Sequence, residues 1–155
     1  MGAFPILSGQ SEAYLLASLQ AYAQSRRRSS IMQPASVPQS EAQMRRLAVH
    51  YAEAGSLASA PAGGDGPGEE IARQGVPADG IPACISCHQP AGSRYPHYPA
   101  LRSQATNYMA QQLRLFRDGI RGGTAYAHIM ATIVRRLSDE QIEAVAAYFG
   151  TPPQR

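Results

Sequence analysis

The 155-residue sequence contains no lysine and no tryptophan, and it has only two cysteines and three phenylalanines. All fourteen basic residues are therefore arginines, and the net charge is +3. No run of residues approaches the roughly 20 apolar positions that a membrane-spanning helix needs. The arginines form no basic stripe interleaved with aromatic side chains, so nucleic-acid binding is not expected. With 44% hydrophobic residues, the chain can still bury the core of one or two small domains.

Charge is spread unevenly along the chain. Residues 55–83 carry one arginine against four acidic residues, whereas residues 84–155 carry eight arginines against four. Two interpretations of this bias stay open, a docking face for an acidic patch on another protein or ordinary solvated surface.

The two cysteines point to the chemistry of the chain, because they lie in the run Cys84-Ile85-Ser86-Cys87-His88. A C-x-x-C-H run is the attachment signature of a c-type haem, in which both thiols add to vinyl groups and the histidine faces the iron. Zinc binding is an alternative, but zinc normally has four Cys or His ligands and would need His50, His97 or His128 as scattered partners. Thiol redox chemistry is another, although the flanks lack the βαβ pattern of a thioredoxin-like motif.

Five segments are predicted to be helical from apolar residues at helical spacing and from cap residues. They are residues 11–24, 40–53, 68–75, 104–119 and 138–149. The last segment opens with a capping box formed by Ser138 and Gln141. Loops are expected at residues 32–34, 89–103 and most of 120–137, with a solvated run of arginines at 26–28.

A stretch rich in Gly, Ala, Pro and Ser at residues 55–67 is typical of a linker. We therefore predict a boundary there between residues 1–54 and 68–155. The first ten residues show neither a charged start nor a long apolar segment, so they are not a secretory signal. Because a c-type haem is normally attached outside the cytoplasm, we expect a processed or truncated chain whose original start lies upstream.

The two parts repeat each other, which also bears on the fold. The alignment pairs residues 4–10 with 98–104, Tyr14 with Tyr108, Met32 with Met130, and Ser40 with Ser138. Residues 4–53 thus look like a second copy of residues 98–151 that lacks a C-x-x-C-H half. Two interpretations stay open: an upstream haem-bearing half outside this sequence, or a degenerate unit kept as a packing or docking surface.

Residues 68–151 resemble a class I bacterial cytochrome c, and the tandem arrangement resembles the two-haem, cytochrome c4-like family. The resemblance rests on residues 80–88, 98–101, Gln104, Tyr108, 116–121, and Met130 placed before 137–140. It implies an all-α fold in which small helices pack around one covalently bound haem c. It also implies a complete cytochrome c domain at 68–155, preceded by a partial unit at 1–54 and the linker at 55–67.

The resemblance assigns the iron ligands and the attachment points. Cys84 and Cys87 would form the thioethers, His88 would be the proximal iron ligand, and Met130 would be the distal ligand. His128 is a rival sixth ligand, because a shift of the loop would bring it toward the iron.

Further residues are assigned to the surroundings of the haem. Pro99 would offer its carbonyl oxygen to the second nitrogen of His88 and so fix the ring and its tautomer. Leu101 and Tyr108 are expected to line the haem, although packing alone would also explain them. Met109 is expected to be a core residue.

Histidine–methionine ligation implies a function. A thioether favours ferrous iron and raises the reduction potential, and two protein ligands leave no open iron site. The resemblance therefore implies single-electron transfer, not enzyme catalysis, in the periplasm or at the outer face of the cytoplasmic membrane. Expected partners are a quinol-oxidising complex, a terminal oxidase or a dehydrogenase. The alternatives are a cytochrome c subunit held stably in a larger dehydrogenase, respiratory or photosynthetic complex, and haem-based catalysis or sensing, which would require loss of Met130 ligation.

Overall fold

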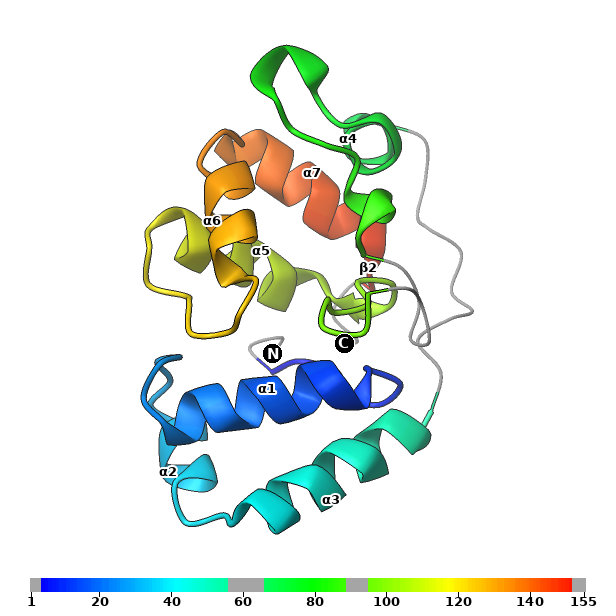
Figure 1. Cartoon of the computed structure of the whole chain (residues 1–155). Coiled ribbons are helices and arrows are strands. Elements are labelled where there is room, and N and C mark those ends of the chain that lie inside the picture. The colour runs from blue at the N-terminus through cyan, green and yellow to red at the C-terminus, as the bar shows by residue number, and fades with distance from the viewer. Residues whose placement is uncertain (1–3, 56–65, 89–94, 152–155) are drawn as a thin grey trace.

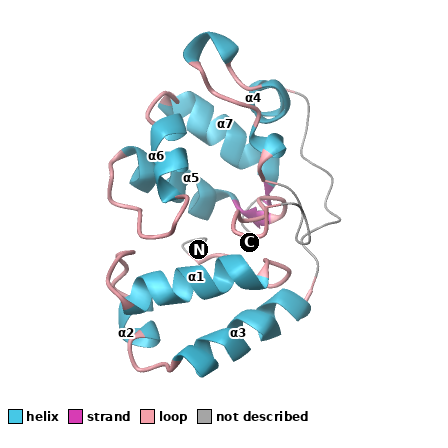
Figure 2. Cartoon of the chain, in the orientation of Figure 1, coloured by secondary structure: helices cyan, strands magenta, loops and turns pink. Residues whose placement is uncertain are grey.

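Helices dominate the computed structural model, which describes residues 4–55, 66–88 and 95–151 (Figure 2). They form two units that face each other (Figure 1). The N-terminal unit contains α1 (Glu12–Ala23), α2 (Met32–Ser36) and α3 (Glu41–Glu53). The C-terminal unit contains α4 (Pro67–Gln74), α5 (Thr106–Arg117), α6 (Ala127–Val134) and α7 (Asp139–Phe149).

Shorter elements connect the helices of the C-terminal unit. Two 3-10 turns, η1 (Pro77–Asp79) and η2 (Cys84–Ser86), follow α4. The strands β1 (Gln104–Ala105) and β2 (Gly150–Thr151) pair in parallel and join the start of α5 to the end of α7. In the described ranges, no helix is both long and apolar enough to span a bilayer.

The five predicted helices are all present, and their ends lie within two residues of the expected ones. Side-chain caps explain this agreement at the starts of α1, α3 and α7. At α7, the backbone N–H of Gln141 donates to Ser138 Oγ at 3.2 Å, and the N–H of Ser138 donates to Gln141 Oε1 at 2.9 Å. The same capping box, formed by Ser40 and Gln43, opens α3. These pairs satisfy backbone donors that the first turn of a helix leaves free.

Two segments expected to be loops are helical instead. Met32 begins the short helix α2, where Pro34 is tolerated because the first turn needs no internal donor at that position. Within residues 120–137, α6 forms because its two ends, Ala127 and Val134, are buried in the core. A helix this short depends on tertiary packing, which the local sequence does not reveal.

The core of the C-terminal unit is built where α4 crosses α7. Gly68 lies so close to α7 that a Cβ there would overlap with the carbonyl oxygen of Ala144. Apolar side chains from all four helices and from the turns between them complete the core: Ile71, Ala72, Ile81, Met109, Ala110, Phe116, Ala127, Val134, Leu137, Ile142, Val145, Ala146, Tyr148 and Phe149. The expectation that Met109 belongs to the core is confirmed.

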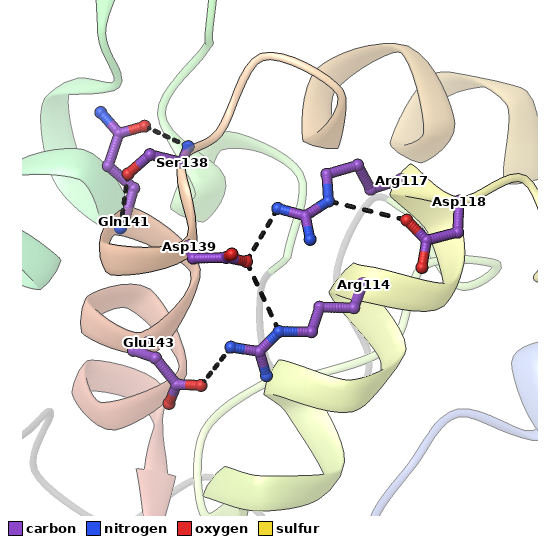
Figure 3. A network of polar contacts seen from close by, with 7 residues as sticks. All are labelled: Arg114, Arg117, Asp118, Ser138, Asp139, Gln141 and Glu143. Carbon is purple, nitrogen blue, oxygen red and sulfur yellow. Dashed lines mark hydrogen bonds and ion pairs between the residues drawn. The ribbon is translucent and has the colours of Figure 1, made fainter.

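A polar network on the surface links α5 to the start of α7 (Figure 3). Arg117 Nη1 donates to Asp139 Oδ1 at 2.9 Å, and Arg114 pairs with both Asp139 and Glu143. The hydrogen bond and the charge of Arg117 lower the pKa of the exposed Asp139 carboxyl. Exposed ion pairs contribute little to stability, so this network orients the capped end of α7 more than it stabilises the fold.

The two units face each other through reciprocal side-chain contacts. Gln10 is 2% exposed, and its amide bonds both backbone groups of Ala100: Nε2 donates to the carbonyl at 2.7 Å, and Oε1 accepts from the N–H at 3.0 Å. Gln104 makes the same pair of bonds to Ile6, at 2.9 and 2.7 Å. The aligned positions of the sequence repeat therefore exchange equivalent hydrogen bonds across the interface.

Arg27 corrects the expectation of a solvated run of arginines. Arg26 and Arg28 are exposed, but Arg27 is only 5% exposed. It is buried because it points into the interface and hydrogen-bonds to Tyr108 and Gln112 of the C-terminal unit.

We expect Gln10→Ala to lower the free energy of unfolding by about 1–3 kcal/mol, because it leaves both backbone groups of the buried Ala100 without a partner. Gln104→Ala should cost less, since Ile6 is 37% exposed and water can replace the lost amide. Chemical denaturation of the haem-loaded protein measures both values. The exposed Gln111→Ala is the control, and an equal loss for Gln10→Ala and Gln111→Ala would contradict the proposed role of the buried amide.

Candidate functional site

A tight turn delivers the C-x-x-C-H run to the C-terminal unit. Val76 and Ile81 form an antiparallel bridge, with N–H to carbonyl distances of 2.8 and 3.1 Å. Gly75, which ends α4, has a φ of +74°, and a Cβ there would overlap with the carbonyl oxygen of Ile81. From the side, Arg136 Nη1 donates to the carbonyl oxygens of Asp79 and Gly80 at 3.2 and 3.0 Å.

The motif itself winds into one turn. The N–H groups of Cys87 and His88 both donate to the carbonyl oxygen of Cys84, at 3.3 and 2.9 Å. Both cysteine side chains are half-buried. Before haem attachment, burial raises the pKa of the Cys84 thiol to about 11.

His88 is held in one orientation by a backbone carbonyl. Its Nδ1 lies 2.8 Å from the carbonyl oxygen of Pro99. Because a carbonyl only accepts hydrogen bonds, Nδ1 carries the proton. Burial lowers the pKa of His88; the hydrogen bond to Pro99 opposes this shift, and the charge of Arg121 adds to it. The neutral imidazole therefore keeps the lone pair of Nε2 free for a metal.

Seven partly buried apolar residues pack against the core cluster and are called the apolar wall: Val76, Cys84, Ile85, Leu101, Leu113, Met130 and Ile133. Leu101 and Met130, both assigned to the haem from the sequence, are among them. Partly buried apolar side chains are of the kind that line a site for a porphyrin ring.

Met130 and its rival His128 are separated by helix geometry. Both lie on α6, and residues two positions apart in a helix point to different sides. Met130 packs against the core, whereas His128 is exposed. The half-buried thioether of Met130 therefore lies closer to the core than the exposed imidazole of His128.

Tyr108 lies deeper in the interface than expected for a simple lining residue. Its hydroxyl accepts a hydrogen bond from Arg27 Nη2 at 3.1 Å. The sequence did not predict this contact, because the two residues are 81 positions apart.

A chain of aromatic rings next to His88 was also missed. The His88 and Tyr98 ring centroids are 6.2 Å apart, Tyr98 contacts Tyr126 edge-on at 5.4 Å, and Tyr95 stacks on Tyr98 at 5.4 Å. His97 lies 5.8 Å from Tyr126 and is exposed. The alignment of Tyr98 with Phe4 was the one sequence signal that marked this aromatic position.

The zinc alternative finds no support at the site. In the part of the chain that the structure describes, no three His, Cys, Asp or Glu side chains gather as a metal site. His50 is exposed on α3, away from the motif turn in the C-terminal unit.

A mainly helical unit that combines a C-x-x-C-H turn, a neutral histidine held in one tautomer and partly buried apolar residues packed on its core is typical of a c-type haem protein. Comparisons with known proteins agree, since a family model described as Cytochrome c matches residues 62–151. The chain is 34% identical to the thiosulfate dehydrogenase electron acceptor of Thiomonas intermedia (strain K12), over 97% of this chain and 71% of that protein. It is 33% identical to cytochrome c4 of Thiocapsa roseopersicina, over 94% of this chain and 77% of that protein.

The solved structures extend this likeness to both units. Reduced recombinant cytochrome c4 from Pseudomonas stutzeri superposes with a TM-score of 0.84 at 29% identity, covering 96% of this chain and 85% of that one. The chain belongs to the cytochrome c family, and its likeness to cytochrome c4 confirms the predicted tandem branch and the class I cytochrome c fold. Its cofactor is a covalently bound haem c, and its function is electron transfer by that haem.

We expect Gly75→Ala to disturb the turn before the motif. A left-handed φ costs a non-glycine residue about 1–2 kcal/mol, and the overlap with Ile81 adds a further cost of roughly 1–3 kcal/mol. Gly119→Ala is a matched control, because Gly119 also has a positive φ, +71°, but a Cβ there meets no atom within 4 Å. Denaturation curves and the haem-to-protein ratio should show a larger loss for Gly75→Ala. Equal losses would mean that the positive φ, and not the overlap with Ile81, accounts for the whole destabilisation of Gly75→Ala.

Proposed function

We propose that the transferred electron resides on one haem c that is attached to Cys84 and Cys87 and ligated by His88 and Met130. The observation that carries this proposal is the hydrogen bond between His88 Nδ1 and Pro99, because it leaves Nε2 as the nitrogen able to bind iron. The haem supplies the one-electron chemistry when bound. The residues of this chain orient it and exclude water from it.

Each surrounding residue has a role that follows from its place. Pro99 keeps His88 in one tautomer, and Leu101 and Leu113 provide half-buried apolar surface that keeps water away. Tyr108 borders the haem at the interface with the N-terminal unit. A dry, fixed site reorganises little when the charge changes, which suits an electron carrier more than an enzyme.

We propose that residues 68–155 form the complete cytochrome c domain, that residues 55–67 link it to the rest, and that residues 1–54 are a partial copy. Supporting this, α1 and α5 are both twelve residues long, and α3 and α7 open with the same capping box. The predicted linker largely lies outside the described residues. Met32, the counterpart of Met130, has no C-x-x-C-H partner within this chain.

We propose that the partners are redox proteins, with a dehydrogenase as electron donor and a quinol-oxidising complex or terminal oxidase as the other partner classes. A relative that is named as the electron acceptor of thiosulfate dehydrogenase supports the first of these. Attachment of haem c and the likeness to cytochrome c4 favour the periplasm or the outer face of the cytoplasmic membrane.

Replacing the cysteines tests haem attachment. We expect Cys84→Ala or Cys87→Ala to leave one thioether, which shifts the pyridine haemochrome band to the red. The double variant should hold no haem that survives a denaturing gel. Ser86→Ala lies in the same turn and is exposed, so it should retain both thioethers. Haem that remains covalent in the double variant would contradict the assignment.

Replacing methionines by leucine tests the sixth ligand, because leucine keeps the volume but lacks the sulfur. We expect Met130→Leu to abolish the weak iron–methionine charge-transfer band of the oxidised protein. The midpoint potential should fall on the order of 0.1 V, within the range of about 0.8 V that axial ligands cover. Met32→Leu and His128→Gln should leave both signals unchanged. A band that persists in Met130→Leu, or disappears in either control, would overturn the assignment.

A further inference from the structure

Two tyrosine rings lie between the histidine of the motif and the helix that carries Met130. The Tyr98 ring centroid is 6.2 Å from that of His88, and Tyr126 contacts Tyr98 edge-on, with 5.4 Å between centroids and 84° between ring planes. Tyr126 immediately precedes α6, which begins at Ala127. We call Tyr98 and Tyr126 the tyrosine pair. Because edge-on rings at this distance attract each other, the pair connects the segment beside His88 to the start of α6.

The first turn of α6 is not capped as the first turns of three other helices are. Serine side chains cap α1, α3 and α7. Tyr126 occupies the capping position of α6, where its side chain makes no capping hydrogen bond within the described range 95–151. Tyrosine is not among the residues that cap helices well, and a helix of eight residues depends on tertiary contacts. The ring of Tyr126 therefore supports this turn through its contact with Tyr98.

The sequence repeat provides an internal comparison for this turn. Met32 aligns with Met130, so Ser36 aligns with Val134. The helices α2 and α6 end at these aligned residues, Ser36 and Val134. However, α2 begins at Met32 itself, whereas α6 begins three residues before Met130. The C-terminal unit thus has additional helical residues directly before the methionine.

The tyrosine pair is present in the same unit as this additional turn. The alignment places Arg28 opposite Tyr126 and Phe4 opposite Tyr98. Arg28 is exposed, and the ring of Phe4 is 67% exposed. Among its described residues, the N-terminal unit therefore has no equivalent of the pair. The longer helix occurs where the second ring is available to hold its start.

The turn that the pair supports also positions the proposed iron ligand. Tyr126 and Met130 are four residues apart, about one helical turn, so they lie on the same side of α6. Met130 packs against the core from this side as a partly buried residue. Two axial ligands must both stay at bonding distance from one iron atom. A contact that joins the His88 segment to the start of α6 restricts the separation of the two ligands.

We propose that Tyr126 is a positioning residue for the sixth iron ligand, because its contact with Tyr98 holds the first turn of α6 and thereby keeps the thioether of Met130 on the iron. This inference rests on the proposed function, which takes Met130 as the ligand. The pair itself binds neither iron nor haem. It slows dissociation of Met130, since the start of α6 cannot move away from His88 without breaking the contact between the rings. The iron of an electron carrier then stays closed to outside ligands.

Cyanide binding to the oxidised, haem-loaded protein tests the proposal, because cyanide reaches ferric iron only after the sixth ligand has left. We expect Tyr126→Leu to raise the limiting rate at saturating cyanide about three- to tenfold, the factor that corresponds to the loss of one aromatic pair. Tyr126→Phe keeps the ring and should bind cyanide at the rate of the unaltered protein.

Tyr95→Leu is the matched control. Tyr95 also stacks on Tyr98, with 5.4 Å between centroids, but it does not adjoin α6. Its replacement removes an aromatic pair of similar energy and should change the rate by less than about twofold. Denaturation curves followed by circular dichroism measure the global stability of each variant, so that a general loss of stability is distinguished from faster loss of the ligand.

A double-mutant cycle assigns the effect to the contact between the two rings. Tyr98→Leu and Tyr126→Leu together should raise the rate no more than the larger single change does, because both remove the same contact. The proposal is overturned if the two single effects multiply, if Tyr126→Phe behaves like Tyr126→Leu, or if Tyr95→Leu and Tyr126→Leu change the rate equally. Tyr126 is 43% exposed, so its replacement should leave the protein folded. If it does not, Tyr98→Leu is judged against Tyr95→Leu by the same rate.

Failure of this inference is distinguishable from failure of the proposed function. If the iron–methionine charge-transfer band persists in Met130→Leu, the proposed ligand is wrong and the inference falls with it. If that band disappears in Met130→Leu while Tyr126→Leu binds cyanide at the unaltered rate, the ligand assignment holds and the role of the tyrosine pair alone is overturned.

Discussion

The orientation of one imidazole is the constraint on which the site depends. His88 donates to Pro99, and Pro99 precedes Ala100, whose N–H and carbonyl are both bonded by Gln10 from the N-terminal unit. Ser11 adds a hydrogen bond to the nearby carbonyl of Pro96. The carbonyl that fixes the tautomer of His88 is therefore held in place by residues about ninety positions earlier in the chain. Metal ligands commonly need such outer partners, and here the second unit anchors the segment that supplies one.

Local features of the sequence were sufficient to predict the motif, five helices and their caps, because each depends on residues a few positions apart. The features that were missed depend on distant contacts. Arg27 looked like part of a solvated run, yet Tyr108 and Gln112 bury it from 81 and 85 positions away. The helix α6 depends on burial of Val134, not on its own sequence. The repeat did contain one usable signal, the equal spacing of Arg27 from Tyr14 and Arg121 from Tyr108.

The repeat also shows what the N-terminal unit lacks. Leu47 on α3 is 38% exposed, whereas its counterpart in the repeat, Val145 on α7, is 4% exposed. The difference arises because α4 packs on α7, and the described part of the N-terminal unit contains no equivalent helix over α3. Its other large exposed apolar side chains are Phe4, Ile6, Ile31 and Val37. With less apolar surface buried inside it, this unit depends more on the interface for its stability.

The same interface buries charge as well as amide groups. Arg27 and Arg121 reach across it to Tyr108 and Tyr14 of the opposite units. Burying a cation is unfavourable, so hydrogen bonds to these hydroxyls and to Gln112 offset part of that cost. The amides of Gln10 and Gln104 keep the two units in contact. The contact that anchors the segment beside His88 is therefore the same contact that keeps Arg27 buried, so loosening it would disturb both.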